Sequence, residues 1–202
     1  VYDEGVPVQS TRIENLAMLR AFLHPLRIEL LGALRVDGPS TASELARRLG
    51  QSSGATSYHL RQLARFGYVV DDEEQPSGRE RRWRAAQPLT SFQVADFIDD
   101  PAGRATLRQL EHERLRWLTG NLQRWFDART TWPRPWVDAA EESDVRMRLR
   151  PDDLTRMTAE IWDVISSYVE AQAPVDDPDA VPVVMHLYAV PDVESAARGA
   201  QS

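Results

Sequence analysis

The stretch SSGATSYHLRQLARFGYV, residues 52–69, decides the fold of this chain. Either of its leading serines suits a helix N-cap, because a hydroxyl there can accept from the free N–H groups of the first turn. Leu60 and Leu63 then recur at helical spacing and predict a buried stripe. Gly67 is typical of the residue that follows a helix end. The stretch therefore predicts one helix from about residue 53 to residue 66, with small and hydroxyl-bearing residues on its outer face.

The segment before this helix predicts a second, shorter helix. Residues 42–49 read ASELARRL, and Thr41 with Glu44 has the spacing of a capping box, in which each side chain bonds the other residue's backbone N–H. Residues 50–52 separate the two helices, which matches the short, Gly-containing turn of a helix-turn-helix. In that motif the second helix lies in the DNA major groove with its first residues against the base edges.

The flanking segments complete a larger pattern. Apolar residues at helical spacing predict two helices before the pair, over about residues 12–23 and 26–35. After the pair, residues 68–70 and 79–86 have the composition and alternation of two strands joined by a polar turn. The order helix, helix, short capped helix, helix and hairpin predicts a winged helix-turn-helix DNA-binding domain over residues 12–88.

Residues 89–202 form the second predicted region and have a different pattern. A long helix is expected over residues 102–129 and another over residues 151–171. Residues 145–149 and 181–190 alternate apolar and polar side chains or are rich in valine, and predict two strands of a small sheet that the last helix covers. The predicted fold class is mainly α with small β: a winged helix-turn-helix followed by a C-terminal α/β region for dimerisation or effector binding.

The net charge of −7 is distributed unevenly over the 202 residues. Residues 12–90 hold 12 Arg against 9 Asp and Glu, whereas residues 91–202 hold 12 Arg against 20 Asp and Glu. Such asymmetry indicates that the N-terminal half meets an anion and that the acidic half does different work. All 24 basic residues are Arg, whose planar fork can bond a phosphate or a guanine edge with two hydrogen bonds.

Several classes of function are disfavoured by what the sequence lacks. It has no cysteine, which excludes disulfides and thiolate metal sites, and its four histidines have no metal-ligand spacing, so we expect no metal and no cofactor. It has no Gly-rich phosphate loop, nucleophile elbow or His-Glu-x-x-His motif, so no enzyme is predicted. No apolar run reaches the roughly 18–20 residues of a membrane helix, and the first residues do not resemble a signal peptide. We therefore expect a cytoplasmic protein with no membrane contact.

The predicted DNA contacts lie on the outer face of the helix 53–66 and on the hairpin. Small residues at the helix start allow close approach to DNA, hydroxyls can donate to phosphates or bases, and an arginine one turn further on can reach a guanine edge. The arginines that crowd the second hairpin strand can bind phosphate, or can pair with the acidic residues 71–74 as a solvated face. The candidate DNA-binding residues are Thr41, Ser53, Gly54, Ser57, Tyr58, Arg61, Arg79, Arg81 and Arg82.

Four segments, HPLRIELLGAL, TASELARRLG, SSGATSYHLRQLARFGYV and GRERRWRA, resemble the arsenic-repressor-like (ArsR) winged-helix regulators over about residues 16–88. The chain is most similar to their metal-independent branch with a C-terminal extension, because residues 42–49 lack the cysteines of the metal-sensing members. The resemblance implies a homodimeric repressor that binds a palindromic operator in double-stranded DNA and leaves it when an effector binds. It also implies that the wing residues Arg79 and Arg81 touch minor-groove phosphates.

Two interpretations stay open for the C-terminal region. In one, the helix 102–129 pairs with the same helix of a second copy. In the other, aromatic side chains line a pocket for a small-molecule effector, although aromatics at helical spacing also suit a core; the candidates are Trp117, Trp125 and Trp162. An alternative for the whole chain is a winged-helix protein–protein interaction module that does not bind DNA, which the overall acidity favours.

Overall fold

The computed structural model describes residues 9–73 and 80–194 of the chain. It is mainly helical with small sheets, which confirms the predicted fold class at that level. The helices are α1 (Leu16–Phe22), α2 (Pro25–Val36), α3 (Ala42–Arg48), α4 (Ser53–Arg65), α5 (Pro101–Ala128), α6 (Arg134–Ala139) and α7 (Pro151–Glu170). The strands are β1 (Ser10–Arg12), β2 (Ser40–Thr41), β3 (Val69–Asp71), β4 (Arg82–Ala85) and β5 (Leu89–Ser91). Two 3-10 turns, η1 (Val94–Asp96) and η2 (Arg129–Thr131), flank α5.

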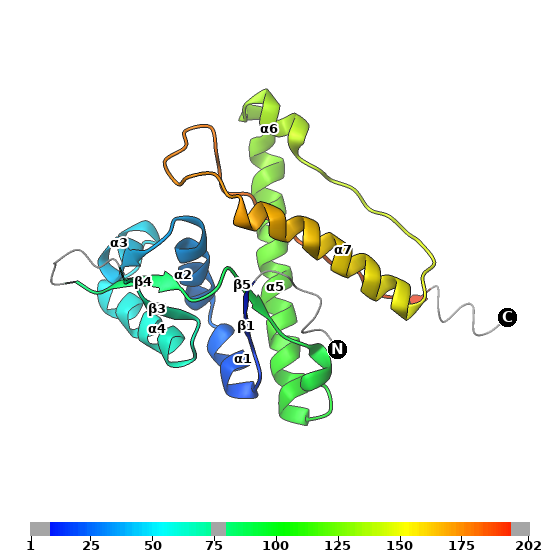
Figure 1. Cartoon of the computed structure of the whole chain (residues 1–202), viewed down its shortest axis with the longest axis horizontal. Coiled ribbons are helices and arrows are strands. Elements are labelled where there is room, and N and C mark those ends of the chain that lie inside the picture. Colours follow the sequence, from blue (N-terminus) through cyan, green and yellow to red (C-terminus); the bar gives the residue numbers. More distant parts are fainter. Residues whose placement is uncertain (1–8, 74–79, 195–202) are drawn as a thin grey trace.

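The helices α1 to α4 pack around one apolar core (Figure 1). Leu60 and Leu63, which the helical spacing placed inward, are fully buried there together with Leu30 of α2 and Leu45 of α3. Burying such a leucine contributes about 1.5–3 kcal/mol relative to leaving it in water. The buried stripe therefore fixes the rotation of α4 about its own axis, and the opposite face of the helix has to point outward.

Local signals set the ends of α3 and α4 as the sequence predicted. The Thr41 hydroxyl accepts from the Glu44 N–H at 3.2 Å, and the Glu44 carboxylate accepts from the Thr41 N–H at 2.8 Å, so the capping box is formed. The Ser52 hydroxyl accepts from the Ala55 N–H at 3.2 Å and caps α4. Gly50, in the turn between the two helices, has a φ of 63°, a conformation that residues with a Cβ rarely adopt.

The wing is an antiparallel pair of β3 and β4, with Asp71 opposite Trp83. A third strand, β2, pairs with the other side of β4 through Ser40 and Thr41, and the sequence pattern did not predict it. Trp83 therefore lies on the central strand, and its side chain is only 4% exposed. The candidate residue Arg79 lies outside the described residues.

The connection from the wing to α5 is tied back to the N-terminal half. β5 pairs in parallel with β1, so α1 begins only at Leu16, capped by Asn15, and not at the predicted residue 12. The guanidinium of Arg35 donates to the Gln87 carbonyl at 3.1 Å and to the Thr90 hydroxyl at 2.7 Å. Burial lowers the pKa of Arg35 to about 10, which leaves it charged at neutral pH.

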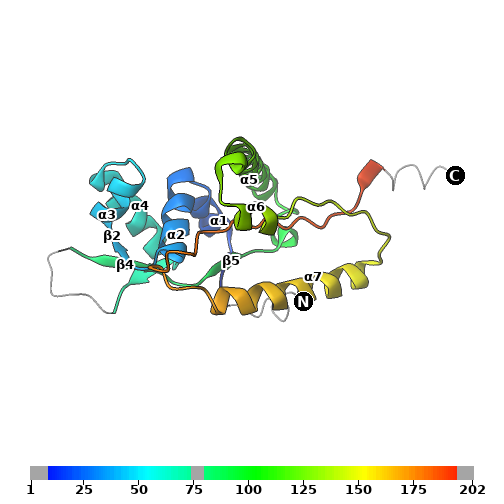
Figure 2. The same cartoon turned by 90° about the horizontal axis from the view of Figure 1, so that it is seen from above.

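The long helix α5 has two halves with different surroundings. Its first half packs against the N-terminal domain and buries Leu107 and Leu110. Gly103 is required there, because a Cβ at that position would overlap the carbonyl oxygen of Phe97. The second half extends away from the core (Figure 1), and α7 crosses it in that view but lies apart from it in Figure 2. The predicted division of the chain into a DNA-binding domain, residues 12–88, and a C-terminal region, residues 89–202, stays a prediction.

The predicted C-terminal strands were wrong. Residues 145–149 and 181–190 are within the described part of the chain, yet neither segment forms a strand there, so the expected small sheet under α7 is not found. Alternation determines which face each side chain takes, but a strand also needs a partner alongside it for its backbone hydrogen bonds. The predicted helix over residues 151–171 is present as α7. Among residues 9–73 and 80–194, no helix is long and apolar enough to cross a membrane.

Candidate nucleic-acid interface

The outer face of α4 carries the candidate residues that the sequence analysis placed on it. Ser53, Gly54 and Arg61 are exposed, and the side chain of Tyr58 is 54% exposed. Ser57 is half-buried. Because Leu60 and Leu63 anchor the other face, these groups are presented on a rigid helix rather than on a loop.

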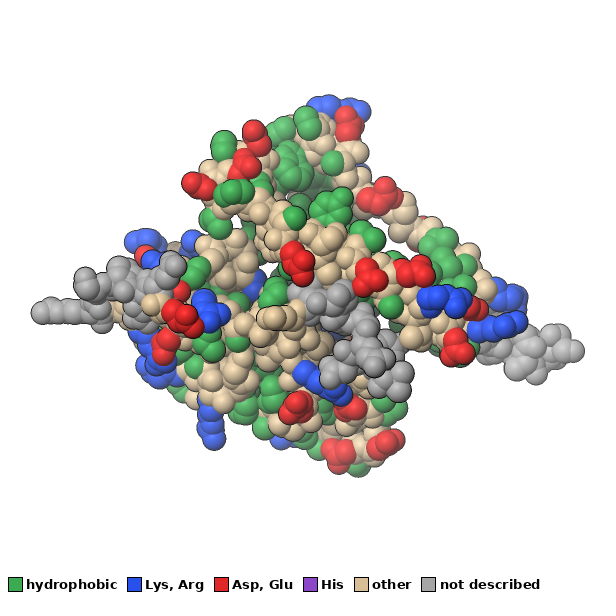
Figure 3. Space-filling model, viewed as in Figure 1, with side chains coloured by type: hydrophobic (Ala, Val, Ile, Leu, Met, Phe, Trp, Pro, Cys, Tyr) green, Lys and Arg blue, Asp and Glu red, His purple; other side chains and the backbone are tan. Residues whose placement is uncertain are grey.

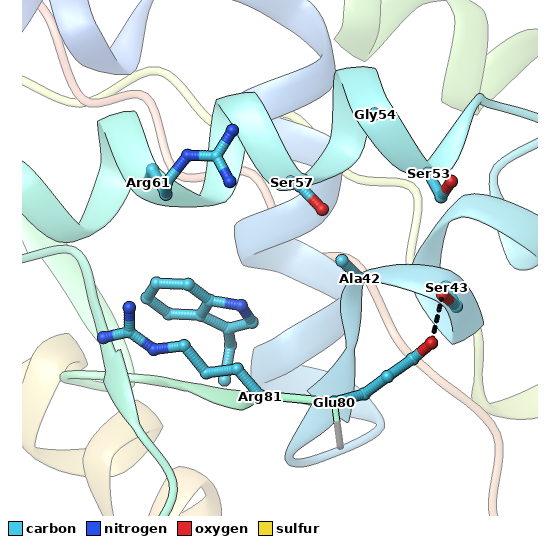
Figure 4. A pocket seen from close by; sticks show the side chains of 9 residues that line it. Ala42, Ser43, Ser53, Gly54, Ser57, Arg61, Glu80 and Arg81 are labelled. Atoms are coloured by element: carbon cyan, nitrogen blue, oxygen red, sulfur yellow. Dashed lines mark hydrogen bonds between the residues drawn. The ribbon is translucent and has the colours of Figure 1, made fainter.

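An open cleft of about 330 Å³ lies between the first turns of α4 and the wing (Figure 4). Ser53, Ser57 and Arg61 line the wall formed by α4, and Glu80 and Arg81 line the facing wall. The hydroxyls and guanidinium groups around this cleft can donate hydrogen bonds to phosphate oxygens or to base acceptors. The complete lining is Ala42, Ser43, Ser53, Gly54, Ser57, Arg61, Glu80, Arg81 and Trp83.

Arg81 is held firmly at the edge of this cleft. Its Nε and one terminal nitrogen donate to the two carboxylate oxygens of Asp71, the second at 2.6 Å. The guanidinium carbon also lies 4.0 Å from the centroid of the Trp83 ring, a cation–π contact. The hydrogen bonds from Arg81 lower the pKa of Asp71, and the same bonds raise the pKa of Arg81.

Arg82 and Thr41 do not line the α4 cleft. Because side chains alternate along a strand, Arg82 points to the opposite face of β4 from Trp83, which lines the α4 cleft together with Arg81. It donates to the Pro39 carbonyl at 2.6 Å and lies 3.4 Å from the Asp72 carboxylate, beside a second cleft of about 290 Å³. The Thr41 hydroxyl is the cap of α3, so it already has a partner.

The wing arginines pair with acidic residues, as the second interpretation of the hairpin expected. Besides the Arg81–Asp71 and Arg82–Asp72 pairs, Arg84 lies 3.7 Å from Glu73. These pairs are mostly exposed to solvent and reduce the net positive charge of the wing. Direct phosphate contacts by Arg81 and Arg82 therefore stay a prediction, and each contact would have to compete with a carboxylate.

Four lining residues of the cleft were not among the candidates from sequence, and two of them, Ser43 and Glu80, are polar and contact each other. The Ser43 hydroxyl donates to the Glu80 carboxylate at 3.1 Å and joins α3 to the start of the wing. These residues are 37 positions apart, and no local motif marks either of them. Their contact places a negative charge at the end of the cleft nearest α3, where it repels any phosphate that approaches.

Behind the exposed face of α4, His59 packs against His24. The two imidazole centroids are 4.2 Å apart, and the ring of Tyr58 meets His59 edge-on at 5.1 Å. Burial lowers the pKa of both histidines, and the nearby Arg27 lowers the pKa of each further. His59 therefore packs within the helical domain. In the described part of the chain, no three His, Asp or Glu side chains come together as metal ligands.

This pair predicts that mild acid destabilises the domain. Both folded-state pKa values lie below the ordinary value of 6.5, so the unfolded chain binds protons more readily. The free energy of unfolding should then fall as the pH falls through 6.5 towards those lowered pKa values. Denaturant titrations at about pH 7.5 and about pH 5.5 measure this loss while most carboxylates stay ionised.

The double variant His24→Asn, His59→Asn should show a smaller loss than the unchanged protein. His112→Asn, which replaces an exposed histidine on α5, should leave the loss unchanged. If all three proteins lose the same free energy of unfolding between the two pH values, the loss does not come from His24 and His59.

The three candidate tryptophans of the C-terminal region have different neighbours. Trp117 contacts His186 edge-on at 5.1 Å. Trp125 donates from its ring nitrogen to Glu142 at 2.8 Å and contacts Trp132 at 5.8 Å. Trp162 is half-buried on α7. An effector pocket lined by these residues stays a prediction.

A comparison with protein-family models matches part of the chain. Residues 22–70 match the family model described as a helix-turn-helix domain. None of the curated proteins matches the chain. The matched segment runs from the end of α1 through α2, α3 and α4 to β3, and so contains the α4 wall of the cleft. The chain thus contains a helix-turn-helix domain, which supports a DNA-binding regulator of transcription.

Proposed function

We propose that this protein is a dimeric, sequence-specific transcriptional regulator that reads DNA with α4. The observation that carries the proposal is the exposed first half of α4, with its small and hydroxyl-bearing residues beside an open cleft. A helix of this kind enters the major groove with its N-terminal residues against the base edges. The core packing of Leu60 and Leu63 holds that edge outward.

The lining of the cleft supports a division of roles. Arg61 lies one turn after Ser57 and can form two hydrogen bonds with the acceptors of guanine. Ser53 and Ser57 can donate to phosphates at the rim of the groove. Gly54 adds no side chain, so the helix backbone can approach the DNA closely. Arg81 faces the same cleft from the wing, where it can meet the sugar–phosphate backbone or the adjacent groove.

The second half of α5 supports the homodimer. Leu115, Leu122 and Phe126 follow a spacing of seven and four residues, which puts them on one face of the helix. Their side chains are 55%, 41% and 42% exposed, and Figure 3 shows further hydrophobic side chains on the surface of this region. An apolar stripe of this length marks an interaction surface. A second copy of the same helix is the proposed partner, because two identical apolar stripes can bury each other across a two-fold axis.

A two-fold dimer would also match the proposed target. Half-sites in palindromic operators lie about 34 Å apart, one turn of DNA. The resemblance to ArsR-like regulators supports a repressor in the cytoplasm that an effector releases from its operator. It also supports a small molecule rather than a metal as that effector, because residues 42–49 carry no cysteine.

The protein–protein interaction module is the second candidate function. Two observations favour it: the net charge is −7, and the wing arginines pair with Asp71, Asp72 and Glu73. A chain of this kind would bind DNA weakly and with no preference for sequence. Selection of bound duplexes from a random-sequence library separates the two functions, since only a DNA reader enriches a defined operator.

The decisive variant for the first function is Arg61→Ala. Loss of a base contact should weaken binding to the selected operator by roughly 1–3 kcal/mol, which is about 5-fold to 150-fold. Gel-shift titrations at fixed salt measure the change. Arg65→Ala is the matched control, because Arg65 is exposed in the last turn of the same helix and does not line the cleft. Equal losses in the two variants would rule out a specific contact by Arg61.

A further inference from the structure

We infer that Asp71 is a positioning residue that aims the Arg81 guanidinium into the cleft, and that this restraint contributes to sequence specificity. The inference rests on the proposed DNA-reading function and names a residue that acts through another. Asp71 itself lies at the end of β3 and does not line the cleft.

The geometry fixes the Arg81 side chain from two directions. The Asp71 carboxylate receives its Nε–H and one N–H of a terminal nitrogen, so the plane of the guanidinium follows the plane of the carboxylate. The Trp83 ring lies against one face of that plane, with 4.0 Å from the guanidinium carbon to the ring centroid. Five N–H donors minus these two leaves three, which lie on the other two edges of the guanidinium, and Arg81 lines the cleft.

Both supports belong to the wing sheet. Asp71 and Trp83 are directly opposite each other in the β3–β4 ladder. Trp83 is on the central strand of the sheet, is buried, and is also paired with Ser40 of β2. The remaining donors of Arg81 therefore have a fixed direction, which a free arginine at a loop tip would lack.

The charge of the pair leads to the same conclusion. Non-specific attraction to DNA depends on net positive charge, because it comes from the release of counterions from the phosphates. Specific reading depends on donors that meet base acceptors or a defined groove shape. Pairing with Asp71 reduces what Arg81 contributes to non-specific attraction and preserves what it contributes to specific reading. Asp71 should thus lower the affinity for arbitrary DNA more than it lowers the affinity for the operator.

Folding stability does not account for this pair. The side chains of Arg81 and Asp71 are 53% and 51% exposed. Exposed ion pairs of this kind contribute little to stability, in general less than about 1 kcal/mol. The variant Asp71→Asn should therefore fold, and its thermal unfolding provides the check.

The test compares Asp71→Asn with the unchanged protein on two duplexes, the operator selected from a random library and a scrambled version of it. Each titration is repeated between about 50 and 200 mM salt. In the variant we expect tighter binding to the scrambled duplex and a salt dependence steeper by about one phosphate contact. The ratio of operator to scrambled affinity should fall by about tenfold, within the range for one directed contact.

Three further variants separate positioning from charge. Asp71→Glu restores a carboxylate and should recover most of the affinity ratio. Arg81→Lys keeps the positive charge but loses the fork, so it should lower the ratio without steepening the salt dependence. Glu73→Gln is the matched control, because it makes the same change of charge on the same hairpin beside Arg84, outside the cleft. It should leave the ratio unchanged.

The outcomes distinguish this inference from the proposed function. An unchanged affinity ratio and salt dependence in Asp71→Asn overturn the role of Asp71, while selective binding by the unchanged protein keeps the DNA-reading function. An equal fall in ratio with Glu73→Gln also overturns it, since any added positive charge would then suffice. If the unchanged protein selects no operator, both proposals fail together.

Discussion

Replacing Leu60 with alanine lowers the free energy of unfolding by about 2–5 kcal/mol. Leu60 is fully buried in the core formed by α1 to α4, so the substitution removes three carbon atoms from a site that cannot close around the loss. It also lies on α4, and the inward stripe of α4 determines which residues face the cleft. We therefore expect weaker DNA binding as a secondary effect of the loss of stability.

Denaturant titration measures the change, with protein concentration held constant because a dimer's stability depends on it. Arg61→Ala is the control on the neighbouring position of the same helix. It removes an exposed side chain and should change the free energy of unfolding by no more than about 0.5 kcal/mol. A loss below about 1 kcal/mol for Leu60→Ala would mean that α4 is not anchored by this residue, and the outward presentation of Ser57 and Arg61 would lose its physical basis.

The features that could be predicted from sequence are those set by residues close together in the chain. The capping box needs only Thr41 and Glu44, three positions apart, and it is formed. The buried stripe of α4 follows from the helical repeat, and Leu60 and Leu63 are buried. The order of elements in the winged helix-turn-helix could therefore be assigned before any contact between them was known.

The features that could not be predicted depend on contacts between distant residues. β2 exists because Ser40 and Thr41 pair with β4 some forty positions later. The Ser43–Glu80 contact has the same origin. The alternating segment at residues 145–149 shows the converse error, because its pattern satisfies the local rule and the structure supplies no pairing strand. The ion pairs of Arg81 with Asp71 and of Arg82 with Asp72, in contrast, join residues close together in the chain, and pairing of the wing arginines with residues 71–74 was one of the two interpretations open from the sequence.

The substitution Leu122→Glu should convert the protein to a monomer and weaken operator binding by about 10²-fold to 10⁴-fold. Leu122 is the middle of the exposed stripe on α5, and in the proposed dimer it packs against its partner helix. A carboxylate there would have to leave water without a counter-charge. A dimer places two DNA-binding domains on the two half-sites of one operator, so the second domain binds at a high effective concentration that separate monomers lack. The loss of this effective concentration accounts for the size of the expected effect.

Sedimentation velocity gives the oligomeric state, and gel shifts on a duplex with one half-site give the affinity of one DNA-binding domain. For that short duplex, the monomeric variant should have the same affinity as one DNA-binding domain of the unchanged protein. Leu122 lies far from α4 along the chain and is already partly exposed, so its replacement should leave the DNA-binding domain intact. Gln109→Glu introduces the same charge at an exposed position on another face of α5 and should remain dimeric. If Leu122→Glu stays a dimer with full operator affinity, the second copy must contact a different surface. The exposed stripe would then need another partner, because Leu115, Leu122 and Phe126 together are too apolar to be explained as an ordinary solvated face.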